Sequence, residues 1–99
     1  MVFDFSEINP GGEYETLVEK DKDGKPRTRC LKNDNTFLVI NPSTIEVRCD
    51  LKLAKLLQEK YESVMQSRYF GRAGIEIVPS SQLSKAELDD LIRLSFNLS

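Results

Sequence analysis

The sequence has no histidine and no tryptophan, and it has only two cysteines, Cys30 and Cys49. Without histidine, imidazole acid–base catalysis and every metal site with a histidine ligand are excluded. Two cysteines alone do not make a zinc site, and the sequence lacks a P-loop and a glycine-rich dinucleotide motif. We therefore expect a protein that is not an enzyme, with no catalytic residue, metal or cofactor. Catalysis by carboxylates alone is the one kind of enzymatic chemistry that these absences leave open.

Long hydrophobic runs are absent as well. No apolar stretch approaches the roughly 20 residues that span a bilayer, and the first residues do not form a signal peptide. These absences predict a cytoplasmic protein with reduced thiols and no membrane partner, while a disulfide between the two cysteines stays open. We expect the 99 residues to form one domain, over residues 1–99, around one core.

The charged residues form blocks within a chain of net charge −2. Residues 20–32 hold six basic and two acidic residues, and residues 48–72 hold six basic and three acidic ones. By contrast, residues 1–19 hold five acidic residues and no basic one. A basic block is more often a solvated surface than a binding patch, so we keep both interpretations, a solvated face and a nucleic-acid contact.

The first half of the chain predicts four consecutive strands. Residues 13–32 alternate about the Asp23-Gly24 pair, which favours a tight β-hairpin turn. Residues 36–40 form a mostly apolar strand, and residues 44–50 form another after an Asn-Pro-Ser turn. Because these turns are too short for crossovers, we expect an antiparallel meander.

Within residues 44–50 the alternation separates two faces. Ile45, Val47 and Cys49 are predicted to point into the core, which makes Cys49 a small buried residue. The residues between them are predicted to point outward: Glu46, Arg48 and Asp50.

Two helices follow from capping signals and periodicity. Asp50 suits the N-cap of a helix whose apolar face is made by Leu53, Leu56, Leu57 and Tyr61. The segment "ESVMQS" either extends this helix or forms a short strand, and residues 74–78 form a fifth strand. The last helix carries a capping box, Ser84 with Glu87, a hydrophobic staple, Leu83 with Leu88, and a buried stripe. That stripe comprises Leu88, Leu91, Ile92, Ser95 and Phe96.

The predicted fold is therefore α+β. Strands run together before the helices, so we expect a two-layer sandwich in which an antiparallel sheet of about five strands carries both helices on one face.

Three stretches, in this order, resemble the MmcQ/YjbR family of small proteins, which are labelled predicted DNA-binding proteins. They are "TFLVINPSTIEVRCD" leading into a short helix, "RYFGRAGIEIV" entering a strand, and a terminal helix "ELDDLIRLSFNLS". The resemblance covers residues 36–99, and the positions that carry it are Arg48-Cys49, Tyr69, Gly71, Arg72, Gly74, Ile75 and Ser95-Phe96. Ile75 stands where the family has tryptophan, and "FSEINPGG" is too short for the family's opening helix.

The resemblance implies an antiparallel sheet backed by helices, similar to type III secretion chaperones, and a DNA-binding function. For "QSRYFGRAGIEIV" we prefer the interpretation that Gly71 and Gly74 turn the chain into a strand, with Arg68, Tyr69 and Arg72 carrying any contact to nucleic acid. The candidate nucleic-acid-binding residues are Lys25, Arg27, Arg29, Arg48, Arg68, Tyr69 and Arg72. The alternative is a protein-interaction or chaperone-like module, with a protein partner or a homodimer at an open sheet edge.

Overall fold

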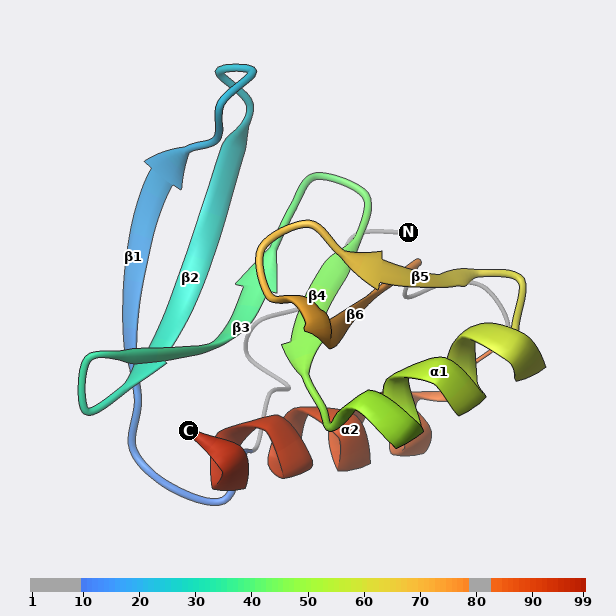
Figure 1. Cartoon of the computed structure of the whole chain (residues 1–99). Helices are drawn as coiled ribbons and strands as arrows, with labels where there is room; N and C mark the ends of the chain where they lie inside the picture. Colours follow the sequence, from blue (N-terminus) through green and yellow to red (C-terminus); the bar gives the residue numbers. More distant parts are fainter. Residues whose placement is uncertain (1–9, 79–82) are drawn as a thin grey trace.

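The computed structural model describes residues 10–78 and 83–99 (Figure 1). Its elements are β1 (Glu15–Lys20), β2 (Pro26–Lys32), β3 (Asn35–Ile40), β4 (Ile45–Arg48), α1 (Leu51–Lys60), β5 (Val64–Ser67), β6 (Gly71–Ile77) and α2 (Lys85–Leu98). The strands form one antiparallel sheet in the order β1-β2-β3-β4-β6-β5. The α+β class and the antiparallel meander over the first four strands are thus confirmed.

The sheet has six strands, where about five were predicted. The additional strand is β5, in the segment for which helix and strand were both open. Tyr61 caps α1 in an extended conformation, at φ −124° and ψ 125°, which ends the helix. Val64 then pairs with Ile77 of β6 and is buried. The last strand also begins earlier than predicted, at Gly71.

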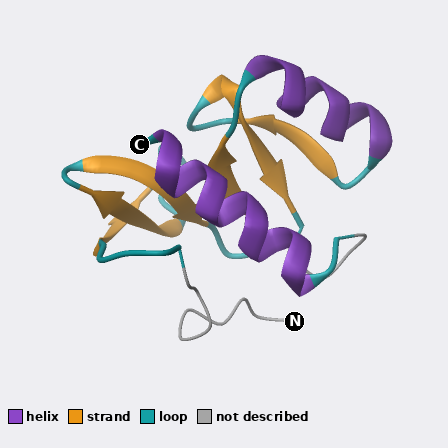
Figure 2. Ribbon diagram, turned by 90° about the horizontal axis from the view of Figure 1, so that it is seen from below, coloured by secondary structure: helices purple, strands orange, loops and turns teal. Residues whose placement is uncertain are grey.

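Both helices cover one face of the sheet, and the core lies between them and the strands (Figures 1 and 2). The register lines up the core side chains across four strands, because Cys30 pairs with Leu38, Leu38 with Val47, and Val47 with Ile75. All four are fully buried. We call this the helix face of the sheet and the other side the open face.

A β-bulge at Phe37 adjusts which side chains enter the core. Cys30 pairs with Leu38 and Leu31 with Thr36, so Phe37 has no partner across the ladder. Its ring is fully buried and makes edge-to-face contacts with Tyr14, at 5.7 Å between centroids, and Phe96, at 5.0 Å. The bulge leaves Thr36 for the open face, where its hydroxyl accepts a hydrogen bond from Arg29.

The apolar face of α1 differs from the prediction at one residue. Asp50 caps the helix as predicted, accepting a hydrogen bond from the backbone N–H of Leu53 at 2.8 Å. Ala54 is buried and Leu57 packs against the core, but Leu56 is 59% exposed. Leu56 lies two residues after Ala54, about 200° around the helix axis, so it faces away from the sheet.

The start of α2 confirms the predicted cap. Ser84 Oγ accepts from the backbone N–H of Glu87 at 3.2 Å, and Glu87 Oε1 accepts from the Ser84 N–H at 3.3 Å. Leu83 and Leu88 are both buried in the core. In the described part of the chain, no helix is long and apolar enough to cross a membrane.

We expect Ser84→Ala to lower the free energy of unfolding by about 0.5–2 kcal/mol, because the first turn of α2 loses its side-chain acceptor. Urea unfolding followed by circular dichroism measures this difference. The matched control is Ser43→Ala, at an exposed position between β3 and β4. Equal losses in the two variants would contradict the cap.

Both cysteines are free and buried, and the predicted burial of Cys49 is confirmed. Burial raises the pKa of the Cys49 thiol to about 11, with a smaller contribution from Asp50, and raises the pKa of the Cys30 thiol to about 12. Because the thiolate is the reactive form, neither thiol is set up for nucleophilic chemistry near pH 7.

Candidate binding surface on the open face

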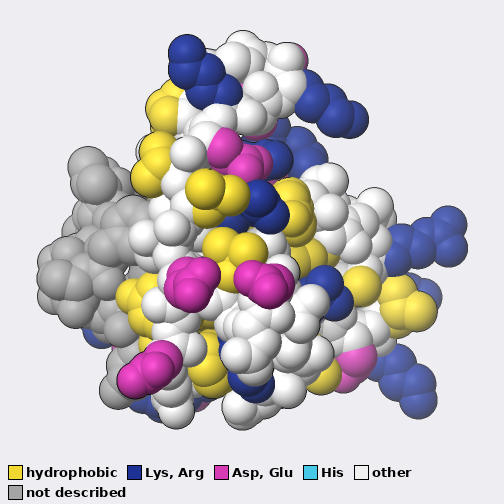
Figure 3. Space-filling view, turned by 90° about the vertical axis from the view of Figure 1, so that its left-hand side faces the viewer, with side chains coloured by type: hydrophobic (Ala, Val, Ile, Leu, Met, Phe, Trp, Pro, Cys, Tyr) yellow, Lys and Arg dark blue, Asp and Glu magenta, His cyan; other side chains and the backbone are white. Residues whose placement is uncertain are grey.

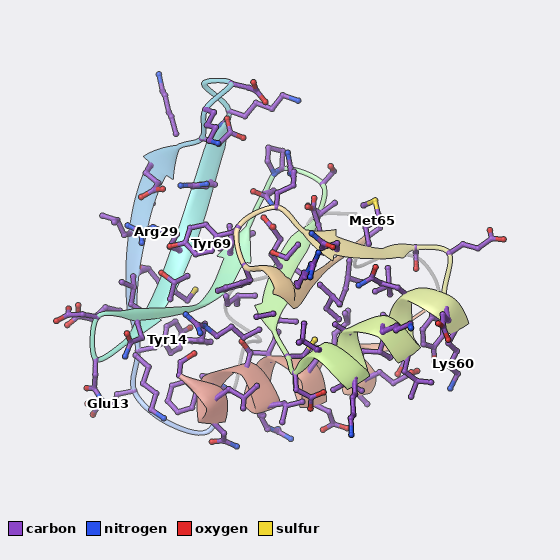
Figure 4. The ribbon with its side chains drawn as sticks, in the orientation of Figure 1. Glu13, Tyr14, Arg29, Lys60, Met65 and Tyr69 are labelled. Atoms are coloured by element: carbon purple, nitrogen blue, oxygen red, sulfur yellow. The ribbon has the colours of Figure 1, made fainter. Side chains whose placement is uncertain are left out.

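Segments that are distant in sequence meet on the open face through Arg29 and Tyr69. Arg29 comes from β2 and Tyr69 from the turn between β5 and β6, and the two side chains point toward one another (Figure 4). Arg29 Nη1 donates to Tyr69 Oη at 3.2 Å, and Tyr69 Oη donates to Thr36 Oγ1 at 3.2 Å. The Arg27 guanidinium lies over the Tyr69 ring, 5.3 Å from its centroid. We call Arg27, Arg29, Arg68 and Tyr69 the arginine–tyrosine cluster.

The two β2 arginines of this cluster share one carboxylate. Glu19 of β1 lies directly opposite Arg27 in the ladder. Arg27 Nε donates to Glu19 Oε2 at 2.6 Å, and Arg29 Nε donates to Glu19 Oε1 at 2.9 Å. The hydrogen bond from Arg27, with help from Arg29, lowers the pKa of the Glu19 carboxyl. Glu19 therefore balances one of the two positive charges of this pair.

Arg68 is paired in the same way. Its Nε and Nη2 donate to Glu76 Oε1 and Oε2, each at 3.0 Å, which is the two-point geometry of a strong arginine–carboxylate pair. Thr44 Oγ1 donates to Glu76 Oε2 at 2.7 Å. The Glu76 side chain is 6% exposed and that of Arg68 is 62% exposed, so the guanidinium forms the outer side of this pair.

Glu46 is the most enclosed carboxylate of the open face. The alternation places it on this face as predicted, but the expected exposure is wrong, because the residue is 2% exposed. Its oxygens accept from Asn41 Nδ2 at 2.8 Å, from Ser67 Oγ at 2.8 Å and from the backbone N–H of Tyr69 at 2.9 Å. The β5–β6 turn thus folds over Glu46, and Glu46 fixes the position of that turn.

Of the seven candidate residues, the structure brings together Arg27, Arg29, Arg68 and Tyr69. Arg48 lies beside them, with Nε donating to the Thr36 carbonyl at 3.3 Å and the guanidinium 5.3 Å from the centroid of the Phe70 ring. Lys25, in the β1–β2 turn, and Arg72, near the start of β6, are exposed. Among the described residues, their side chains form no hydrogen bond or ion pair with the cluster.

A pocket of about 540 Å³ opens between the β1–β2 turn and the cluster. Its lining residues are Asp21, Lys22, Asp23, Arg27, Asn41, Glu46, Arg68 and Tyr69. Three of these are basic and three are acidic. The lining carries no excess of positive charge that would select a phosphate. Among residues 10–78 and 83–99, no three cysteine or carboxylate side chains are placed to hold a metal ion.

The sequence interpretation missed the acidic partners of the cluster: Glu19, Glu46 and Glu76. The sequence held a signal for each of them, and the clearest was for Glu19. A tight turn at Asp23-Gly24 sets Glu19 opposite Arg27, and opposite charges at such positions attract. For Glu46 and Glu76 the available signal was a glutamate between two apolar residues on the strand of "IEV" and "IEI".

Glu19→Gln is expected to destabilise the protein in a pH-dependent way. The folded-state pKa of Glu19 is lowered, so its stabilising contribution is present above the unfolded-state pKa, near 4.3, and is lost as the pH falls through the folded-state value. Wild type should therefore exceed the variant in stability at pH 6, and the difference should shrink below about pH 4. Urea unfolding at several pH values tests this, and a difference that stays constant with pH would contradict it. Glu15→Gln, on the same strand without an arginine opposite, is the control.

Comparison with known proteins gives no relative. No family model matches the sequence, and no curated protein and no solved structure matches it. The resemblance to the MmcQ/YjbR family therefore stays a prediction.

Proposed function

We propose that the chain is a non-enzymatic protein-binding module that pairs its β1 edge with an extended strand of a partner. The observation that carries this proposal is that β1 has exposed side chains on both of its faces. Five of its six residues are exposed, including Leu17 at 44% and Val18 at 74%. In the described part of the chain β1 pairs only with β2, so its outer edge has no strand beside it.

An edge strand presents unpaired N–H and C=O groups that a partner strand can complete. Figure 3 looks onto the β1 side of the molecule, where hydrophobic side chains reach the surface between acidic and basic ones. Leu17 lies on the open face, opposite Arg29, and Val18 lies on the helix face, opposite Thr28. A partner strand would cover one of these apolar side chains on each face, and main-chain hydrogen bonds would supply the rest of the affinity.

The arginine–tyrosine cluster favours protein binding over nucleic-acid binding, because its arginines already form ion pairs with glutamates of the same chain. A phosphate would have to compete with Glu19 for Arg27 and Arg29, and with Glu76 for Arg68. Such competition removes much of the gain from counterion release on which nucleic-acid affinity depends. The cluster instead ties the β1–β2 hairpin to the β5–β6 turn and so holds the edge strand in place.

One observation favours a second function, nucleic-acid binding. Basic residues from the two blocks of the sequence do come together on one face, with Arg48 beside the cluster and Lys25 exposed at the hairpin turn. An exposed aromatic side chain between arginines, as at Tyr69, is also the kind of surface on which single-stranded bases stack.

Site-specific photo-crosslinking tests the edge. A photoreactive amino acid at Val18 is compared with the same residue at Leu98, which is 51% exposed at the end of α2. We expect discrete adducts from position 18 and not from position 98, with the attached partner residues in an extended segment. Adducts to β1 of a second copy would support the edge and make this chain its own partner. The same adducts from both positions, or none from position 18, would overturn the proposal.

A further inference from the structure

A second surface joins exposed leucines to a groove beside α1. The groove has a volume of about 760 Å³ and lies between the first turns of α1 and the start of β6. Its apolar lining comes from Cys49, Leu51, Leu53, Leu56 and Ala73. Leu51 is 61% exposed and Leu56 is 59% exposed, the two largest exposed apolar fractions on α1. A surface helix that turns two leucines to solvent next to a groove is typical of a site that binds an apolar side chain of a partner.

Basic residues outnumber acidic ones around the groove, with Lys52, Lys55 and Lys60 against Asp50 and Glu59. Lys52 lines it, and Lys55 and Lys60 follow on the exposed side of α1, with Glu59 as the one acidic residue of the helix. Among the described residues, Lys52 and Lys55 form no ion pair. The acidic residue at the groove, Asp50, is engaged as the N-cap of α1. Leu56 therefore lies between lysines, one helical turn after Lys52 and one before Lys60.

Arg72 is next in sequence to the β6 side of the groove, although it does not line it. It is exposed and directly precedes Ala73, whose carbonyl accepts a hydrogen bond from the backbone N–H of Cys49 at 3.0 Å. That hydrogen bond joins the segment before α1 to β6 and fixes the floor of the groove. The basic residues therefore come from α1 and β6, while the chain as a whole has a net charge of −2.

We propose that this groove binds an acidic, apolar segment of a partner protein, with large apolar side chains against Leu51 and Leu56 and carboxylates toward Lys52 and Lys55. The charge complementarity selects this occupant. A neutral apolar segment would leave the lysines uncompensated, and a basic one would be repelled. The proposal goes beyond strand addition, because it uses a different surface and a different kind of contact, and either can hold without the other.

Selection from a library of random peptides displayed on phage, with the full chain immobilised, tests the groove directly, because it samples many peptide sequences at once. We expect the enriched peptides to combine aspartate or glutamate with leucine, phenylalanine, isoleucine or tryptophan. The affinity of the best peptide, measured by fluorescence polarisation, should fall at least tenfold with Leu56→Gln. It should also fall with Lys52→Glu, and that loss should diminish at high salt.

Leu94→Gln, on the exposed side of α2, is the matched control and should leave the affinity unchanged. Glutamine is a good helix former, so both variants should keep the circular dichroism spectrum and the unfolding midpoint of the wild type. Failure to enrich any peptide, enrichment of basic or uncharged peptides, or equal binding by Leu56→Gln and wild type would each overturn the proposal. None of these outcomes depends on β1, so failure of the strand-addition proposal is measured separately.

Discussion

Replacing Glu46 by alanine is expected to lower the free energy of unfolding by about 3 kcal/mol or more, the largest effect of any single change on the open face. The carboxylate is 2% exposed and accepts hydrogen bonds from Asn41, Ser67 and the Tyr69 backbone. Removing it leaves three donors without their acceptor, and a buried donor left unsatisfied costs about 1–3 kcal/mol. Relief of repulsion from Glu76, which pairs with Glu46 across β4 and β6, offsets part of this loss.

Glu46→Gln is the matched variant, because it keeps the volume and one carbonyl oxygen. It should lose less than half as much stability as Glu46→Ala. Urea unfolding followed by circular dichroism compares the two. An alanine variant as stable as the wild type would show that Glu46 does not hold this turn.

Gly74→Ala is expected to lower the free energy of unfolding by about 3 kcal/mol, at the upper end of the cost of overpacking. A Cβ at this position would lie 2.6 Å from Phe70 Cβ and 2.7 Å from the Val47 carbonyl oxygen. The second contact is backbone of β4, a strand paired on both sides, so it cannot move without disturbing the sheet. The sequence interpretation gave Gly71 and Gly74 the same turning role, but Gly74 lies inside β6 opposite Arg48 and is required for close packing.

Gly71→Ala separates packing from backbone conformation. Gly71 has a φ of +64°, and no atom lies within 4 Å of the position that its Cβ would take. Its replacement should cost only the left-handed conformation, about 1–2 kcal/mol. Thermal or urea unfolding of both variants tests the difference, and a Gly71→Ala loss that exceeds the Gly74→Ala loss would contradict the two roles.

Local signals predicted much of this fold. The Asp23-Gly24 turn, the alternation over residues 44–50 and the caps at Asp50 and Ser84 depend on neighbours in sequence, and all of them are found in the structure. The features that were missed depend on partners far along the chain. Val64 is a strand residue because it pairs with Ile77 of β6. Phe37 has no partner across the ladder, and its ring packs against Phe96 of α2.

The candidate surface was predictable to a similar extent. The sequence analysis placed the β2 arginines, Arg68 and Tyr69 among the candidate binding residues, and Arg29 does contact Tyr69, forty positions away. It did not show how these cations are used, because the positions of their acidic partners follow from strand register and from the fold of the β5–β6 turn. Leu56 shows the same limit. Its spacing of three from Leu53 predicted that it lies on the apolar face of α1, but in the structure it is exposed to solvent.

The arginines of the open face, we infer, stabilise the fold and do not bind nucleic acid. The measurement that tests this most directly is titration of a fluorescently labelled DNA, once as duplex and once as single strand, over about 50–200 mM salt. We expect no saturable binding even at the lowest salt, for the wild type and for the Arg27→Ala, Arg29→Ala double variant alike. Saturable binding by the wild type would contradict this inference if the logarithm of the binding constant falls linearly with the logarithm of the salt concentration and the slope is smaller in the double variant. That result would assign the open face to nucleic acid.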